Sequence, residues 1–507
     1  MLEHLNVGDI LSILLFLSII ATLMIGYPIA ITLAGTSLIF AFIGRQFGVF
    51  DYDLLSGLAS RYLGSMLNEV LVAVPLFIFM GLILERSGIA EALLTTMGQL
   101  FGKLRGGLAY SVVVVGALLA ASTGVVGATV VTMGLISLPA MLRAGYDPKV
   151  ATGTICASAT LAQIIPPSTV LIFIGDLLAG VNQQAQLKMG NFSPEPISVG
   201  DLFAGALIPG VMLAGLYLIW IVYKAVFQPE TVPSLKMTDQ ERRGLPRRVV
   251  VVLIPPLALI VAVLGSILGG IATPTESASI GAIGALVLAA LNRRLSLDTL
   301  RYVARNTMIT TSIIFVIVLA ASLFSLVFRG LGGEHLVEEA LRNIPGGAFG
   351  AMLAVMAIMF ILGFFLDTFE IILIMLPICG PALIVLGIDP LWIGIMIGIN
   401  LQTSFLTPPF GFTLFYMRGI APPSVLTGQI WAGAIPFVAL QLFGLALVWS
   451  FPPVATWLPD QIFKQTQISQ PGGRPGGGID SLIDRSIEDS DDAPKDESDD
   501  PTSQRRQ

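Results

Sequence analysis

The chain has 507 residues, of which 55% are hydrophobic and 12% charged, and its mean hydropathy is +0.85. Long uncharged runs recur from Ile10 to Phe451, so the composition excludes a soluble globular protein and predicts a multi-pass protein of the lipid bilayer. The formal net charge is −6, but residues 460–507 hold 11 Asp and Glu against 6 Lys and Arg, which leaves −1 for residues 1–459. No basic face indicates a nucleic-acid partner.

The first apolar runs, residues 10–25 and 28–43, predict two transmembrane helices. Residues 45–64 space their charges among Phe and Leu, which is typical of an amphipathic helix at the membrane interface. Residues 66–84 begin with polar groups and contain Pro75, and this short apolar stretch predicts a re-entrant hairpin.

Two interrupted stretches follow. Residues 107–142 predict about two spans that are broken at residues 122–124, and residues 149–180 predict a helix interrupted at Pro166-Pro167. A span at residues 201–227 ends this half of the chain.

The second half continues in the same manner. Residues 228–248 are rich in Lys and Arg, and such an excess in a short loop predicts the cytoplasmic side. The later apolar segments are residues 249–271, 277–291, 307–328, 347–387, 391–418 and 427–450. The predicted organisation is a first transmembrane repeat (1–227), a basic central loop (228–248), a second transmembrane repeat (249–459) and an acidic, disordered tail (460–507).

An internal duplication relates the two halves. Residues 139–173 align with residues 381–415 without a gap at an offset of 242 residues, and nine of the 35 positions are identical. The identities include both double prolines, Pro166-Pro167 and Pro408-Pro409. In a membrane chain, apolar segments interrupted by Gly or Pro at matching places of two halves are the best sequence indication of a transport site.

The double prolines supply the first candidate site residues. Each removes two amide donors and pushes the preceding residue out of the helical region, so the carbonyls of residues 163–165 and 405–407 lose their helical partners. Free carbonyls and hydroxyls are the hard oxygen ligands that a desolvated alkali cation requires. A single kinked helix is more often structural than functional, but two at matched positions favour a functional role.

Polar residues inside apolar segments are the next candidates. The hydroxyls of Ser122 and Thr123 beside Gly124 could ligate an ion, or these small residues could serve helix packing. Asp367 lies in an otherwise apolar run, and an intramembrane carboxylate is a functional hypothesis by default, although a structural hydroxyl partner is an alternative. Weaker candidates of the same kind are Glu69, Glu276, Glu370, Asn400, Thr403, Ser404 and Thr407.

Enzyme functions find little support. The chain has no G-x-x-x-x-G-K-[ST] motif for ATP, and His4 and His335 are its two histidines, so a zinc hydrolase lacks ligands and no Ser–His pair is plausible. Cys156 and Cys379 both lie in apolar segments and offer neither a disulfide framework nor a four-cysteine metal site.

Five motifs in order resemble one family: residues 74–81, 120–124, 157–168, 273–276 and 406–411. Over about residues 5–455 the chain resembles the large membrane subunit, of the DctM type, of tripartite ATP-independent periplasmic (TRAP) transporters. Within that family it is most similar to the branch labelled for mannitol or chloroaromatic compounds.

The resemblance implies a sodium-coupled importer of the bacterial inner (cytoplasmic) membrane in which an elevator-like transport domain moves against a scaffold. It also implies two partners, a small four-helix membrane subunit and a periplasmic substrate-binding protein, and a small organic acid, a carboxylate, as substrate. No cofactor is implied besides sodium as the coupling ion.

Carried onto this chain, the sodium sites should lie where hairpins meet broken helices. Some relatives carry Gly-Ser-Ser where this chain has Ser122-Thr123-Gly124. The residues expected to bind sodium are Ser122, Thr123, Gly124, Gln163, Ile164, Pro166, Asp367, Thr368, Thr403, Thr407 and Pro408. The residues expected to contact the substrate are Asn68, Ser168, Glu276, Asn400 and Ser404.

The sequence thus predicts an all-α polytopic transporter subunit with two inverted repeats, re-entrant hairpins and broken helices. The alternative within the same class is a stand-alone sodium/carboxylate elevator symporter, which dependence on a binding protein would discriminate. A channel would need a ring-forming filter motif, and the sequence offers none.

Overall fold

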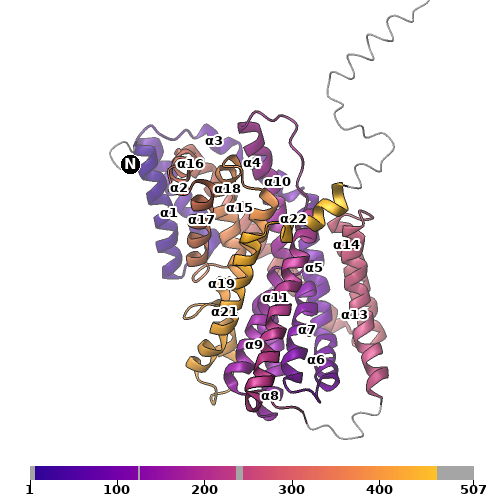
Figure 1. Ribbon diagram of the computed structural model, residues 1–507. Coiled ribbons are helices and arrows are strands. Elements are labelled where there is room, and N and C mark those ends of the chain that lie inside the picture. Colours follow the sequence, from indigo (N-terminus) through magenta and orange to yellow (C-terminus); the bar gives the residue numbers. More distant parts are fainter. Residues whose placement is uncertain (1–5, 124–125, 236–243, 465–507) are drawn as a thin grey trace, which may run out of the picture. The chain divides into compact units, whose positions relative to one another are not determined.

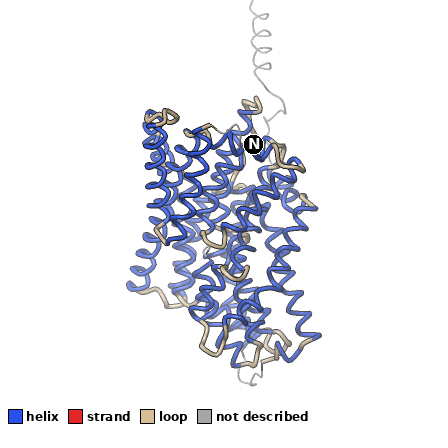
Figure 2. Tube along the Cα trace, turned by 90° about the vertical axis from the view of Figure 1, so that its left-hand side faces the viewer, coloured by secondary structure: helices blue, strands red, loops and turns tan. Residues whose placement is uncertain are grey.

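A computed structural model describes residues 6–123, 126–235 and 244–464, and every regular element in this part of the chain is a helix (Figures 1 and 2). Residues up to Pro459 form one compact unit, and the short helix Asp460–Lys464 belongs to a second. Nine of the described helices are long and apolar enough to cross a membrane. The predicted all-α multi-pass membrane fold is therefore confirmed. The predicted tail from residue 465 onward lies outside the described residues.

The first repeat ends with a long helix that leads into the central connection. Its elements are α1 (Val7–Ile25), α2 (Ile29–Gln46), α3 (Asp53–Ser56), α4 (Leu58–Met66), α5 (Glu69–Arg86), α6 (Ile89–Leu100), α7 (Gly107–Thr123), α8 (Val126–Arg143), α9 (Pro148–Thr160), the 3-10 turn η2 (Leu161–Gln163), α10 (Thr169–Lys188) and α11 (Val199–Phe227).

The second repeat follows a short turn, η3 (Pro229–Thr231). Its elements are α13 (Leu245–Leu268), α14 (Pro274–Leu291), α15 (Leu297–Gly330), α16 (Gly333–Arg342), α17 (Gly347–Leu362), α18 (Thr368–Val385), α19 (Pro390–Leu406), α20 (Phe412–Ile420), α21 (Thr427–Ser450) and α22 (Pro453–Pro459).

The helix order repeats with the offset seen in the sequence. Helices α8 and α18 begin at Val126 and Thr368, and α9 and α19 begin at Pro148 and Pro390, in both cases 242 residues apart. The two repeats are inverted: in Figure 1 the first starts with α1 at the upper end, and the second starts with α13 at the lower end. The duplication therefore extends to the architecture.

The matched Asp-Pro pairs start the same helix in both repeats. The Asp147 carboxylate accepts a hydrogen bond from the Lys149 amide at 2.8 Å, and Asp389 accepts one from the Trp392 amide at 2.8 Å. Proline occupies the first helical position after each aspartate, where its missing N–H costs nothing. The Asp-Pro pairs, which are identical in the two repeats, therefore cap the N-termini of matching helices.

Residues 66–84 do not form the predicted hairpin, and the bent α4–α5 pair fits either a broken span or a re-entrant segment. Helix α5 runs without interruption through Pro75, and a bend of 50° separates it from α4. Membrane helices tolerate an internal proline because neighbouring groups satisfy the freed carbonyl. The helix hairpins are instead α7–α8 and α17–α18, whose members pack against each other, and the turn of the second lies at residues 363–367.

Both predicted helix interruptions are present. Helix α9 passes into η2 before Pro166-Pro167, and α10 starts at Thr169. Helix α19 ends before Pro408-Pro409, and α20 starts at Phe412. Both Pro-Pro peptide bonds are cis.

Small residues let the broken helices pack closely. A Cβ atom added at Gly153 of α9 would collide with the carbonyl of Gly433 in α21, so the two backbones are in direct contact. A buried polar cluster joins α11, α19 and α21: the side-chain amides of Gln402 and Gln441 donate to the Tyr217 hydroxyl at 3.1 and 2.7 Å.

Candidate functional site

The first helix break joins the second hairpin through Gln163. This side chain at the end of η2 is fully buried, and its amide nitrogen donates to the Thr368 hydroxyl at 2.8 Å. No hydrogen bond satisfies the amide oxygen of Gln163 in the part of the chain that the structure describes. An unpaired buried oxygen is costly unless a ligand binds it, so Gln163 marks one candidate ion ligand.

The second break meets the turn of the same hairpin. Ser404, near the end of α19, is fully buried, and a Cβ added at Gly363 would collide with its hydroxyl. No described residue forms a hydrogen bond with that hydroxyl. Gly363 therefore lets the α17–α18 turn approach α19 closely and places a free hydroxyl between them.

The two threonines predicted beside this break bond to their own helix. Thr403 donates to the carbonyl of Ile399 at 2.8 Å, and Thr407 donates to that of Thr403 at 2.8 Å. Each hydroxyl oxygen keeps a lone pair that could still face a cation. Their role as ligands stays a prediction.

The carbonyls freed by the prolines are partly taken by hydroxyls. Ser168 donates to the carbonyl of Gln163 at 3.0 Å, and Thr413 donates to that of Phe405 at 2.7 Å. The Thr407 carbonyl accepts a hydrogen bond from the Gly411 amide at 3.0 Å, so three bonded carbonyls correct the expectation that all six would be free. Among the described residues, no hydrogen bond reaches the carbonyl oxygens of Ile164, Ile165 and Leu406.

A cavity of about 590 Å³, here the central cavity, brings several predicted residues together. Gln163, Asp367 and Thr368 line it, and Asp367 is the residue that immediately precedes α18. The Asp367 amide donates to Glu370 Oε2 at 2.8 Å, which satisfies one of the free donors at this helix start. The remaining lining residues come from α5, α8, α10, α15, α18, α19 and α20: Leu82, Glu85, Val126, Gly127, Ala128, Val131, Thr132, Val170, Tyr302, Phe369, Phe405, Phe412 and Tyr416.

None of the five predicted substrate residues lines this cavity. Ser404 packs against Gly363, as described above, and the other four form other contacts. Asn68 caps α5 and donates to Asp176 at 2.6 Å, and Glu276 is exposed and exchanges capping bonds with Thr273 at the start of α14. Asn400 donates to the carbonyl of Met356 at 2.8 Å, while Ser168 is held by Gln163 as described above. The structure assigns each of these four a structural bond.

Three predicted sodium residues are not fully described. Ser122 and Thr123 end α7, but their side chains and Gly124 lie outside the described residues. Helix α7 packs against η2, so the α7–α8 hairpin approaches the first break, and sodium binding by residues 122–124 stays a prediction. Pro166 and Pro408 occupy the two breaks themselves.

Glu85 is a charged residue in the wall of the central cavity that was not identified from the sequence. Glu85 of α5 accepts a hydrogen bond from the Thr132 hydroxyl of α8 at 2.6 Å, and Tyr302 of α15 lines the cavity beside them. Glu85 and Arg86 end an apolar stretch directly after the residues that were interpreted as a hairpin. Extending that stretch by two residues would have identified them as polar residues at the end of a membrane helix.

The fold and this cavity define a multi-pass membrane protein with a polar cavity at two helix breaks. The Alcanivorax borkumensis YdaH transporter, whose crystal structure was described as having an unusual topology, superimposes with a TM-score of 0.58 at 15% identity, covering 88% of this chain and 99% of that one. This likeness establishes the architecture of the chain.

Sequence comparison establishes the family. Residues 16–454 match the family described as tripartite ATP-independent periplasmic transporter, DctM component, and the chain belongs to that family. It is 29% identical over 449 residues to the ectoine TRAP transporter large permease protein TeaC of Halomonas elongata, covering 88% of this chain and 98% of that protein. It is likewise 29% identical over 476 residues to the C4-dicarboxylate TRAP transporter large permease protein DctM of Vibrio cholerae, covering 88% and 97%. The chain is therefore a multi-pass TRAP transporter permease and not an enzyme.

Proposed function

We propose that this chain is the large permease subunit of a sodium-coupled TRAP transporter that imports a small organic acid. A periplasmic binding protein delivers the acid, and a separate small membrane subunit completes the transporter. One observation carries the proposal: two helix breaks and a hairpin turn meet around one cavity and leave buried oxygens without partners. Those oxygens are Gln163 Oε1, on the wall of the cavity, and Ser404 Oγ, which lies against the hairpin turn at Gly363 and does not line the cavity.

Sodium fits this oxygen set better than other coupling ions. The unpaired groups are an amide oxygen, a hydroxyl and the carbonyls of Ile164, Ile165 and Leu406, all neutral hard donors. Neutral oxygens at unwound membrane helices coordinate alkali cations in secondary transporters. The Asp367 carboxylate on the cavity wall supplies a negative charge nearby. A bound cation would offset that charge and favour the entry of an anionic substrate.

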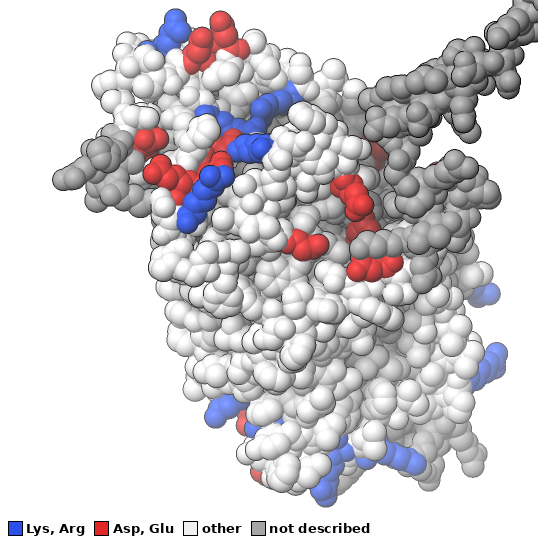
Figure 3. Space-filling view, turned by 45° about the horizontal axis from the view of Figure 1, so that its top comes forward, with Lys and Arg blue, Asp and Glu red and all other residues white. Residues whose placement is uncertain are grey.

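The charge distribution assigns the two ends of the helices to the two sides of the membrane. The lower end in Figure 3 carries mostly Lys and Arg, whereas the upper end carries acids and cations together. By the positive-inside rule the lower end is cytoplasmic. The first repeat then starts at the periplasmic side of a bacterial inner membrane.

Uptake into proteoliposomes tests the proposal. The vesicles hold this chain with its small subunit, and the binding protein and a panel of labelled C4-dicarboxylates and other carboxylates are added outside, with or without an inward sodium gradient. We expect uptake when both sodium and the binding protein are present. Sodium-driven uptake without the binding protein would identify a stand-alone symporter instead, and uptake indifferent to sodium would refute the coupling.

A further inference from the structure

Two further cavities follow the central cavity in series: a middle cavity lies next to it, and an outer cavity lies next to the middle one. A middle cavity of about 310 Å³ shares Leu82, Glu85, Thr132 and Tyr302 with the central one. An outer cavity of about 560 Å³ shares Glu91, Leu135 and Ile136 with the middle one. Because each neighbouring pair shares wall residues, the three form a series between α5, α6 and α8.

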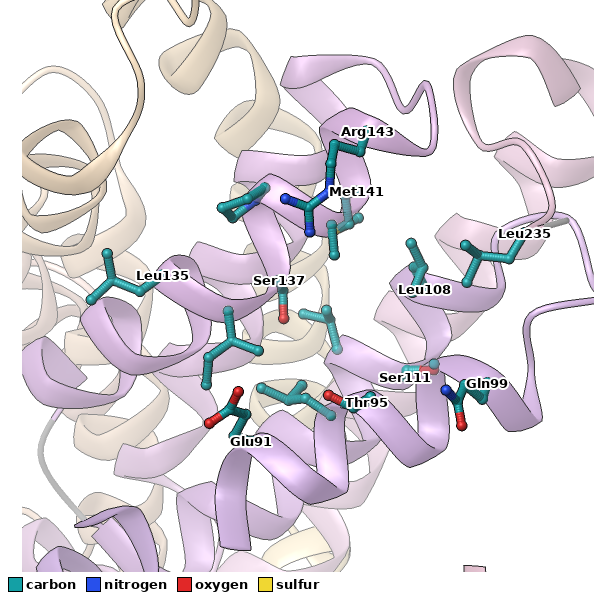
Figure 4. A pocket seen from close by; sticks show the side chains of 16 residues that line it. Glu91, Thr95, Gln99, Leu108, Ser111, Leu135, Ser137, Met141, Arg143 and Leu235 are labelled. Carbon is teal, nitrogen blue, oxygen red and sulfur yellow. The ribbon is translucent and has the colours of Figure 1, made fainter. Parts of the chain in front are cut away.

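The series leads toward the basic end of the helices. The outer cavity is lined by Arg143 at the end of α8 and by Leu235 of the central connection (Figure 4). Figure 4 shows Glu91 and Arg143 on opposite sides of this cavity, with the polar side chains of Thr95 and Ser137 between them. This is the end of the helices that we assign to the cytoplasmic side.

The passage between the central and middle cavities is polar. The Thr132 hydroxyl donates to Glu85 across it, joining α8 to α5. Beside this bond the Arg86 guanidinium carbon lies 4.7 Å from the centre of the Tyr302 ring. Both side chains line the middle cavity.

Arg86 differs from the other charged residues of this wall. Of the residues that line the central and middle cavities, it alone is cationic, whereas Glu85, Glu91 and Asp367 are acidic. It forms no hydrogen bond or ion pair with any residue that the structure describes. Stacking on Tyr302 leaves the edge of the guanidinium, with its N–H donors, free to bind a ligand.

We propose that the three cavities form the release path for the substrate and that Arg86 is its anion-selecting residue, binding the carboxylate as it leaves the central cavity. The inference rests on the proposed transport function and adds to it a route and a residue. A planar guanidinium matches a carboxylate through two parallel N–H···O bonds. The Tyr302 ring orients that fork, so Tyr302 is a positioning residue.

The path can be tested without knowing the substrate. The test measures how fast charged, thiol-reactive reagents modify a cysteine introduced in the wall of the central cavity. Val131 lines the central cavity but not the middle one, so a Val131→Cys variant reports on passage beyond Arg86. The native Cys156 and Cys379 are buried and need not be replaced. The probes are two membrane-impermeant methanethiosulfonates, the anionic ethylsulfonate and the cationic trimethylammonium compound, applied to inside-out vesicles of the complete transporter.

We expect Val131→Cys to react from the cytoplasmic side, with the anionic reagent favoured. Adding Arg86→Gln should slow the anionic reagent about fivefold, the effect of one unit charge at close range in water. Arg86→Lys should keep most of the preference because it keeps the charge. Leu104→Cys, on the exposed turn after α6, gives the intrinsic ratio of the two reagents.

Arg305→Gln is the matched control, since Arg305 lies one turn from Tyr302 on α15 and lines none of the three cavities. An unchanged reagent preference in Arg86→Gln, or an equal loss in Arg305→Gln, would overturn the role of Arg86. Reaction of Val131→Cys from the periplasmic side alone would overturn the path. These readouts measure access, so they are independent of whether uptake needs sodium or a binding protein.

Discussion

Ser404→Ala separates a sodium ligand from an ordinary buried hydroxyl. The Ser404 side chain is fully buried, lies against Gly363 and has no hydrogen-bonding partner among the described residues. Burying a hydroxyl without a partner costs about 1–3 kcal/mol. In sodium-free buffer the alanine variant should therefore be more stable than the native chain by about 1 kcal/mol.

With sodium present the sign should reverse. A contact between a hydroxyl oxygen and a charged group contributes about 1.5–3 kcal/mol, so its loss should weaken sodium binding about ten- to a hundredfold. Thermal unfolding of the purified transporter, followed over a series of sodium concentrations with choline as the replacement ion, measures both effects. Ligand binding to the folded state raises the unfolding temperature as its concentration exceeds the dissociation constant.

Ser37→Ala provides the control. Ser37 in α2 is also fully buried with an unpaired hydroxyl, but it lies on a helix that has no part in either break. Its replacement should stabilise the chain without changing the response to sodium. If Ser404→Ala responds to sodium like the native protein, Ser404 is not a ligand and this part of the reasoning fails.

Three further outcomes are expected. Asp367→Asn should abolish sodium-coupled uptake but leave folding and membrane insertion intact, because asparagine also suits a helix N-terminus; normal uptake would show that the charge is not needed. Tyr217→Phe removes the acceptor of the buried Gln402 amide and one of the two acceptors of the Gln441 amide, which keeps the Thr160 hydroxyl at 3.1 Å; it should lower the free energy of unfolding by about 1–3 kcal/mol, whereas an unchanged denaturation midpoint would contradict the hydrogen bonds. Burial acts to raise the pKa of Glu334, but the bonds to Lys188 and Arg329 outweigh it and lower that pKa. Their stabilisation is therefore present above the ordinary glutamate pKa of 4.5 and is lost as the pH falls through the lowered pKa; thermal unfolding across this range should show the loss in the native chain and not in Glu334→Gln.

Features set by neighbouring residues could be predicted from the sequence. The apolar runs, the two double-proline breaks and the offset of 242 residues all depend on local composition and order, and the structure reproduces them. Hydrophobic length decides which segments can cross a bilayer, and proline lacks the amide that a continuous helix requires. The sequence therefore determined that the elements are membrane helices and where two of them are interrupted.

The error at residues 66–84 has a physical cause. Pro75 and the polar pair Asn68-Glu69 indicate a break when they are considered alone, but tertiary contacts satisfy them. Asn68 caps α5 and bonds to Asp176, and the carbonyl of Glu69 accepts a hydrogen bond from Thr275 at 2.6 Å. Since those partners lie more than 100 residues away along the chain, no local pattern could show that the helix continues.

The composition of the site was decided by the tertiary structure. Gln163 and Thr368 are 205 residues apart, and Glu85 and Thr132 are 47 apart, yet each pair is hydrogen bonded at the central cavity. Conversely, Glu276 resembles a site residue in the sequence but caps a helix outside the cavity. The sequence by itself determined where helices must break and which oxygens become available. Only the packing of the two inverted repeats decided which of those oxygens face one another, because side-chain proximity depends on how distant helices cross.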